Sequence, residues 1–169
     1  IAAANVVLCH FLITLFPLGF QYLWPGVANA SVQAGVAEKI ISAPFLSIFW
    51  NGNFPVCVFF VLSGYVLSAK SSRDGDLSNL TTMALRRYFR LGVPVLGSVL
   101  FAFFVMKVGA SAHMRVAELT GNLWLAQFWK FDPTLFGALK DGAYGAMLRG
   151  GSLFVSVLWT MRVELLGSF

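Results

Sequence analysis

Long stretches without charged residues set the predicted architecture of this chain. Residues 1–37, 40–69 and 91–106 contain no Asp, Glu, Lys or Arg. A helix needs about 17–25 mostly apolar residues to cross the hydrocarbon core of a bilayer. The pattern therefore predicts membrane-spanning helices at about 1–24, 54–69 and 91–107, and a last one at 153–169.

The connecting segments predict the orientation of these spans. Residues 70–90 carry five basic and two acidic residues, so the positive-inside rule places this loop in the cytoplasm. The amino terminus is then cytoplasmic, and residues 25–53 and 108–152 are extracytoplasmic. Five basic residues between 107 and 152 count against this orientation, although three acidic residues offset them in part. Residues 44–50 and 123–131 are apolar but too short to cross, which predicts interfacial helical turns.

Composition supports a membrane protein. The 169 residues are 58% apolar and 11% charged, whereas soluble chains carry about 25% charged residues. This excludes an ordinary soluble domain, a disordered chain and a disulfide-stapled module. Cys9 and Cys57 both lie in apolar runs, so we predict that they are packing residues. The predicted fold class is an all-α integral membrane protein, a polytopic transmembrane helix bundle forming a single membrane domain over 1–169.

The beginning and end of the chain suggest two further interpretations. The chain begins inside one apolar stretch and ends inside another, so we expect it to be part of a larger protein. Residues 6–16 with the small residues at 28–30 resemble a signal peptide and its cleavage site. The full spanning length of the first stretch and the apolar segments downstream favour a retained span.

Ionisable groups within the predicted spans are the first candidates for chemistry. A charge at the centre of a bilayer costs about 2.5–3.5 kcal/mol on insertion scales, so such residues usually have a function. His10 lies in the first span and Glu164 in the last. His10 could instead be a packing residue bonded to a carbonyl. Glu164 and Arg162 lie two positions apart, on opposite sides of a helix, so we expect the partner of Glu164 on another helix.

An arginine cluster next to the third span has two interpretations. Arg86 and Arg90 are four positions apart and share a helix face, whereas Arg87 is rotated from them by about 100°. Arginines at an inner membrane boundary can serve topology alone. Three guanidinium groups can also bind phosphate through bidentate hydrogen bonds. The spacing leaves both interpretations open.

The remaining motifs exclude several kinds of site. Ser63 and Gly64 form a small-residue pair, which favours close helix packing. The pair lacks the flanking glycines of a nucleophile elbow, so a seryl intermediate is unsupported. His10 and His113 each stand alone in the sequence, and we expect no metal site.

Four segments in this order resemble the membrane acyltransferase 3 family. They are His10 in the first span, residues 59–65 (FFVLSGY), residues 86–94 (RRYFRLGVP) and residues 158–164 (LWTMRVE). The resemblance implies a bundle of about ten transmembrane helices, of which this chain is the amino-terminal part. The basic residue that the family carries eleven positions before the histidine would precede Ile1.

The resemblance also implies an activity and its residues. Members move acyl groups onto hydroxyls of extracytoplasmic glycans and other acceptors. The donor would be acyl-CoA, most often acetyl-CoA. It would be a substrate, and no bound cofactor is expected. His10 would act as a base or form an acyl-imidazole, and Glu164 would orient it or hold the acceptor. The donor phosphates would contact Arg86, Arg87 and Arg90, and the possible cavity-lining residues are Asn5, Ser63, Tyr65 and Trp159.

The expected partners are acyl-CoA, a glycan or other hydroxyl acceptor and membrane lipid, with no nucleic acid, at the plasma (inner) membrane. The alternative function is a transporter or export component with a buried His/Glu proton relay, for which helices broken near Pro17 or Pro55 would be suitable.

Overall fold

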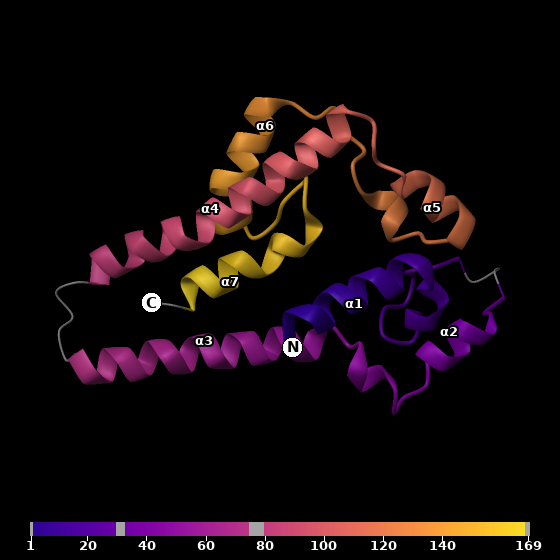
Figure 1. The fold of residues 1–169 in the computed structure, drawn as a ribbon, viewed down its shortest axis with the longest axis horizontal. Coiled ribbons are helices and arrows are strands. Elements are labelled where there is room, and N and C mark those ends of the chain that lie inside the picture. Colours follow the sequence, from indigo (N-terminus) through magenta and orange to yellow (C-terminus); the bar gives the residue numbers. More distant parts are fainter. Residues whose placement is uncertain (1, 30–32, 75–79, 168–169) are drawn as a thin grey trace. The chain divides into compact units, whose positions relative to one another are not determined.

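The computed structural model describes residues 2–29, 33–74 and 80–167, in which every regular element is a helix (Figure 1). An isolated β-bridge joins Ala28 to Asn122. The chain divides into two compact units, Ile1–Phe59 with Ser111–Phe128 (unit 1) and Phe60–Ala110 with Trp129–Phe169 (unit 2). The all-helical class is thus confirmed for this part of the chain.

Short helices dominate unit 1. It contains α1 (Ala2–Leu15), α2 (Val36–Ile41), α5 (His113–Thr120) and the 3₁₀ turns η1 (Pro17–Phe20), η2 (Ser47–Phe49) and η4 (Leu125–Gln127). Helix α3 (Asn53–Asp74) begins in unit 1 and continues into unit 2. Unit 2 also contains α4 (Leu80–Lys107), α6 (Leu135–Lys140), the π-helix η5 (Asp141–Arg149), the 3₁₀ turn η6 (Ser156–Trp159) and α7 (Thr160–Leu166).

The helix bounds differ from the predicted spans in ways that local chemistry explains. Helix α1 ends at Leu15 instead of continuing to residue 24, because Pro17 disfavours helical backbone at Phe16, which has φ −128° and ψ 59°. The predicted loop 70–90 is largely helical, since α3 continues to Asp74 and α4 begins at Leu80. In place of the single helix predicted at 153–169, the described residues form η6 and the short α7, which follow the π-helix. The predicted interfacial turns contain η2 and η4.

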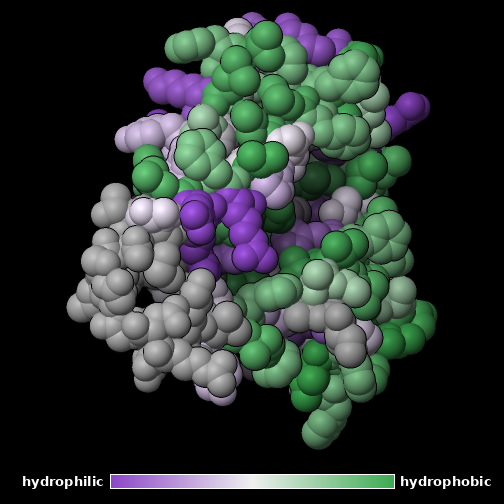
Figure 2. All heavy atoms as spheres, turned by 60° about the vertical axis from the view of Figure 1, so that its left-hand side comes forward, coloured by the Kyte–Doolittle hydropathy of each residue, from purple (hydrophilic) through white to green (hydrophobic). Residues whose placement is uncertain are grey.

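The strongest candidate for a membrane span is the segment Leu85–Lys107 of α4. It is long and apolar enough to cross a bilayer by length and composition, whereas the apolar helices Ala3–Leu15 and Asn53–Tyr65 are shorter. Thus one of the four predicted spans passes this test among the described residues. Apolar residues cover much of the coloured surface in Figure 2.

Apolar side chains occupy both the buried and the exposed sides of α4, although Arg86 and Arg90 near its beginning are also exposed. Val95, Val99 and Ala102 are buried, while large apolar side chains are exposed at Leu85, Phe89, Val93, Phe101 and Phe104. A helix at the surface of a soluble protein normally carries polar side chains on its outer face. Apolar side chains on the exposed face of α4 therefore support contact with lipid.

The core of unit 1 forms around the carboxyl-terminal half of α1. Cys9 and Ile13 are buried with Phe20, Val27, Ala28 and Ile41, and Trp24, Trp50 and Trp124 pack against this cluster. A methyl group at Gly52 would lie 2.9 Å from the Cys9 sulfur, so the backbone approaches α1 closely there. Cys9 is the packing residue that was predicted. The same prediction for Cys57 is wrong, because its thiol side chain is exposed on α3.

A buried carboxamide joins α1 to the segment that follows α5. Asn122 is only 1% exposed, and its Nδ2 donates to the carbonyls of Ile13 at 2.8 Å and Thr14 at 3.3 Å. Its Oδ1 accepts a hydrogen bond from the Leu125 N–H at 2.8 Å. The last carbonyls of a helix have no partner within the helix. Asn122 supplies that partner at the end of α1.

Helix α4 is the centre of unit 2, with α6, η5 and α7 packed against it (Figure 1). One buried cluster contains Val95, Ala146, Met147 and Leu165. A methyl group at Gly142 would lie 2.8 Å from Leu96 Cδ1, so the π-helix backbone lies directly on α4. Small residues permit such close approach between membrane helices.

Asp141 fixes the turn that leads into α7. Its Oδ2 accepts hydrogen bonds from the Ser152 hydroxyl at 2.5 Å and from the N–H groups of Leu153 at 3.1 Å and Phe154 at 3.4 Å. The carboxylate is largely buried at the start of the π-helix. It therefore satisfies the backbone of a non-helical turn on the way to the helix that carries Glu164.

The Asn122 contacts predict a measurable loss of stability on truncation. Asn122→Ala should lower the free energy of unfolding by about 2–3 kcal/mol, because it leaves buried carbonyl and N–H groups unpaired. Thermal unfolding of the detergent-solubilised protein would measure the change. Gln127→Ala removes an exposed carboxamide from the same segment and should stay within about 0.5 kcal/mol of wild type. Equal losses in both variants would contradict the assigned role.

Candidate functional site

The hydrogen bond of His10 determines which ring nitrogen can act as a base. The half-buried imidazole lies on α1, and its Nδ1 is 2.8 Å from the carbonyl oxygen of Val6. A carbonyl oxygen only accepts hydrogen bonds, so Nδ1 carries the proton in this contact. In the neutral imidazole, Nε2 then keeps its lone pair. This is the tautomer that a base or nucleophile acting through Nε2 requires.

An aromatic side chain from a distant part of the sequence lies beside this imidazole. The ring centroids of His10 and Trp124 are 6.4 Å apart, with the planes tilted by 45°. Trp124 in turn makes an edge contact with Phe128, at 4.7 Å and 86°. Its backbone N–H donates to the Val27 carbonyl at 3.2 Å. Unit 1 thus surrounds His10 with ordered neighbours.

Asn5 connects α1 to the turn η2. Its Nδ2 donates to the Phe49 carbonyl at 2.7 Å, and its Oδ1 is buried without a hydrogen-bond partner in the described part of the chain. Asn5 and His10 are five positions apart, so they project about 140° from each other around α1. The prediction that Asn5 lines a cavity with His10 stays a prediction.

The three arginines of the cluster lie on one continuous helix but have different surroundings. Arg87 is half-buried, and its Nη2 donates to the Ser63 hydroxyl of α3 at 2.7 Å. Its Nε is buried without a hydrogen-bond partner among the residues described. Arg86 and Arg90 are exposed one turn apart. Two guanidinium groups are therefore open to a ligand, and the third links α4 to α3.

The small-residue pair on α3 makes a polar contact with α4. A methyl group at Gly64 would meet no described atom within 4 Å, so the close packing predicted there is not found in this part of the chain. Ser63 instead accepts the hydrogen bond from Arg87. Directly after Arg87 on α4, the Tyr88 hydroxyl donates to the Ala143 carbonyl of η5.

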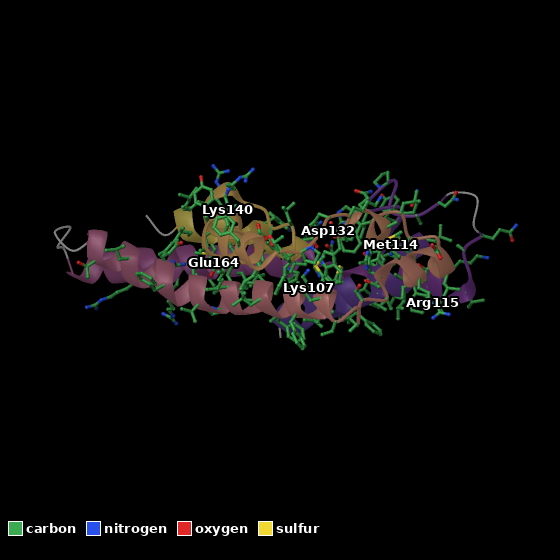
Figure 3. The ribbon with its side chains drawn as sticks, turned by 90° about the horizontal axis from the view of Figure 1, so that it is seen from above. Lys107, Met114, Arg115, Asp132, Lys140 and Glu164 are labelled. Atoms are coloured by element: carbon green, nitrogen blue, oxygen red, sulfur yellow. The ribbon has the colours of Figure 1, made fainter. Side chains whose placement is uncertain are left out.

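Glu164 lies half-buried on α7, where Figure 3 labels it, next to the buried Leu165. Arg162 is exposed, and its Cδ would lie 2.8 Å from a methyl group at Gly150. Trp159 and Tyr65 are exposed large side chains. Their predicted roles in lining a cavity are not tested by these observations.

The predicted site residues fall into the two units. Asn5 and His10 belong to unit 1. A contact between His10 and Glu164, which one of the two predicted roles of Glu164 would need, would join the units, and it stays a prediction. Unit 2 contains the remaining predicted residues, which are Ser63, Tyr65, Arg86, Arg87, Arg90, Trp159 and Glu164.

Sequence reasoning missed three residues that order the surroundings of these groups: Asn122, Trp124 and Asp141. Asn122 follows Gly121, whose positive φ of 66° ends α5. A Gly-Asn pair after a helical pattern signals such a turn, although not the long-range bonds that its side chain makes. No group of three or more His, Cys, Asp or Glu that could hold a metal occurs among the residues searched.

The comparisons with known proteins give one match. The family model described as an acyltransferase domain matches residues 1–169, the whole chain. No curated protein and no solved structure matches it. On this match, the chain belongs to the membrane-associated acyltransferase 3 family.

Proposed function

We propose that this protein transfers an acyl group, acetyl in particular, from acyl-CoA to a hydroxyl of an extracytoplasmic acceptor, with carbohydrate as the acceptor class. The observation that carries the proposal is the His10 tautomer, because the bond from Nδ1 to Val6 leaves the Nε2 lone pair for chemistry. Family membership supports acyl transfer, and the histidine geometry supplies a group capable of it.

The proposed reaction needs a group that accepts the hydroxyl proton and a sulfur that leaves the acyl carbon. His10 Nε2 takes the proton of the acceptor hydroxyl as its oxygen attacks the thioester carbonyl carbon. The C–S bond breaks, the acyl group becomes an ester, and the sulfur leaves as thiolate. The imidazolium returns the proton to that sulfur and gives the free thiol of CoA. In the alternative route Nε2 itself attacks first and forms an acyl-imidazole.

The position of His10 along α1 supports an acceptor that arrives from the outer side. His10 lies five positions before the end of α1 at Leu15, which is about 7.5 Å along a helix. Its aromatic neighbour Trp124 belongs to the segment 108–152, which the charge pattern predicts to be extracytoplasmic. Glu164, half-buried on α7, is proposed to orient His10 or to hold the acceptor hydroxyl.

Arg86 and Arg90 are proposed to bind the donor phosphates. Both are exposed and lie one turn apart, so their guanidinium groups can contact neighbouring phosphates. Arg87 is already bonded to Ser63, and its role in the proposal is to hold this end of α4 against α3. We place the protein in the inner membrane with its amino terminus in the cytoplasm, where acyl-CoA is made.

The first prediction concerns His10 itself. His10→Ala should lower the turnover of labelled acetyl-CoA by about 10²–10⁴-fold, because general-base catalysis contributes a factor of that size. The full-length protein in membranes is the sample, and both hydrolysis and acyl transfer are measured. His113→Ala removes the other histidine of the chain and should retain turnover. Full activity of His10→Ala would remove the assigned role, and no acetyl-CoA binding even in wild type would favour the transport alternative.

The second prediction separates phosphate binding from topology. Arg86→Gln and Arg90→Gln should each raise the KM for acetyl-CoA about tenfold or more, because each removes a charge-assisted hydrogen bond. Turnover of S-acetylpantetheine, which lacks the nucleotide phosphates, should be unchanged. Arg149→Gln, at another exposed arginine, is the control and should leave both KM values unchanged. Equal effects on the two donors would favour a purely topological role.

The third prediction concerns orientation in the membrane. In a variant without Cys9 and Cys57, a cysteine at Ser111 should react with a membrane-impermeant maleimide added to intact cells. A cysteine at Ser72 should react only after lysis, because the basic segment 70–90 is predicted to be cytoplasmic. The reverse labelling pattern would invert the proposed topology.

A further inference from the structure

We propose that Trp124 is a positioning residue for His10, whose indole holds the imidazole in the orientation that acyl transfer requires. This inference rests on the proposed acyltransferase function, which it deepens by naming the group that orients the reactive ring. It starts from a contact within unit 1 that joins positions 10 and 124 of the chain.

The imidazole is restrained from two directions. The hydrogen bond between Nδ1 and the Val6 carbonyl holds one edge of the ring against α1. The Trp124 indole lies beside the ring, with a centroid separation of 6.4 Å that falls within the 4.5–7 Å range of aromatic pairs. One hydrogen bond alone leaves the ring free to tilt about its axis. An adjacent rigid indole limits that motion.

Trp124 is itself held more firmly than a surface aromatic residue. It packs against the core cluster of unit 1, and its ring meets the Phe128 ring edge-on at 4.7 Å. The backbone N–H of Trp124 donates to the Val27 carbonyl. The following residue, Leu125, donates its N–H to the Asn122 Oδ1 at 2.8 Å. A side chain fixed at both ring and backbone can serve as a platform for its neighbour.

The same buried carboxamide ties this platform to the helix that carries His10. Asn122 Nδ2 donates to the carbonyls of Ile13 and Thr14, which lie about one turn beyond His10 on α1. The Thr14 hydroxyl donates to the His10 carbonyl at 2.7 Å. The register between α1 and the turn bearing Trp124 is therefore set by buried hydrogen bonds.

Orientation of this kind acts on the chemical step. Reacting atoms must be held in a narrow range of distances and angles, and a displacement of about 1 Å can cost on the order of 100-fold in rate. Loss of the indole should therefore lower kcat. The KM for acetyl-CoA should change little, because the proposed phosphate contacts lie on α4.

The first experiment tests the restraint on His10 without relying on activity. Diethyl pyrocarbonate modifies neutral imidazole, and peptide mass spectrometry of the full-length membrane protein follows His10 and His113 separately. Trp124→Leu should speed modification of His10 and leave the rate at His113 unchanged. Trp124→Phe keeps an aromatic ring and should stay near wild type. The matched control is Trp24→Leu, because Trp24 packs on the same core cluster but stacks on Phe20.

The second experiment measures the consequence for acetyl-CoA turnover. Trp124→Leu should lower kcat by about 10- to 100-fold with the KM for acetyl-CoA within about twofold of wild type. Saturation binding of acetyl-CoA counts the folded protein, so that a loss of native molecules is not read as a lower kcat. Trp124→Phe should recover most of the rate.

Three results would overturn the inference. Trp124→Leu and Trp24→Leu could change His10 modification and kcat equally, which would show a general packing role. Trp124→Leu could leave both quantities at wild-type values, or it could speed modification without lowering kcat. Activity of His10→Ala would instead defeat the proposed function, and the modification rates would still report whether Trp124 restrains the ring.

Discussion

Backbone groups that leave a helix within an apolar region need polar partners, and the rest of this structure depends on that constraint. Buried N–H and C=O groups without hydrogen bonds cost several kcal/mol in the absence of water. Asn122 meets the requirement where α1 ends, by bonding the carbonyls of Ile13 and Thr14. Asp141 meets it in unit 2, where its carboxylate receives a hydroxyl and two N–H groups from the turn before η6. In each unit, a buried polar side chain thus satisfies backbone groups beside the apolar core.

The break in α1 determines the surroundings of His10. Because the helix stops before Pro17, His10 lies close to a helix end and meets an aromatic residue from a loop. Trp124 and Asn122 give this position its order.

The arginines show how one motif can serve two purposes. The sequence left both a phosphate-binding role and a boundary role open for all three arginines. The structure gives Arg87 a partner in Ser63 and leaves Arg86 and Arg90 exposed. A fixed guanidinium next to exposed ones can hold α3 and α4 together while its neighbours meet a ligand. The two interpretations can therefore apply to different members of the cluster.

The sequence by itself determined the features that arise within one segment. Uncharged stretches indicated an all-helical membrane protein, the spacing of Arg86 and Arg90 placed them on one helix face, and four short motifs indicated the family. Pro17 also indicates where α1 ends, although the hydrophobic pattern alone favoured a longer helix. Only the tertiary structure decided the His10 tautomer, the indole beside it and the bonds of Asn122, which reach across 109 residues to Ile13. Such contacts depend on which distant segments the fold brings together. Hydrophobic periodicity carries no information about which distant polar group satisfies a helix end.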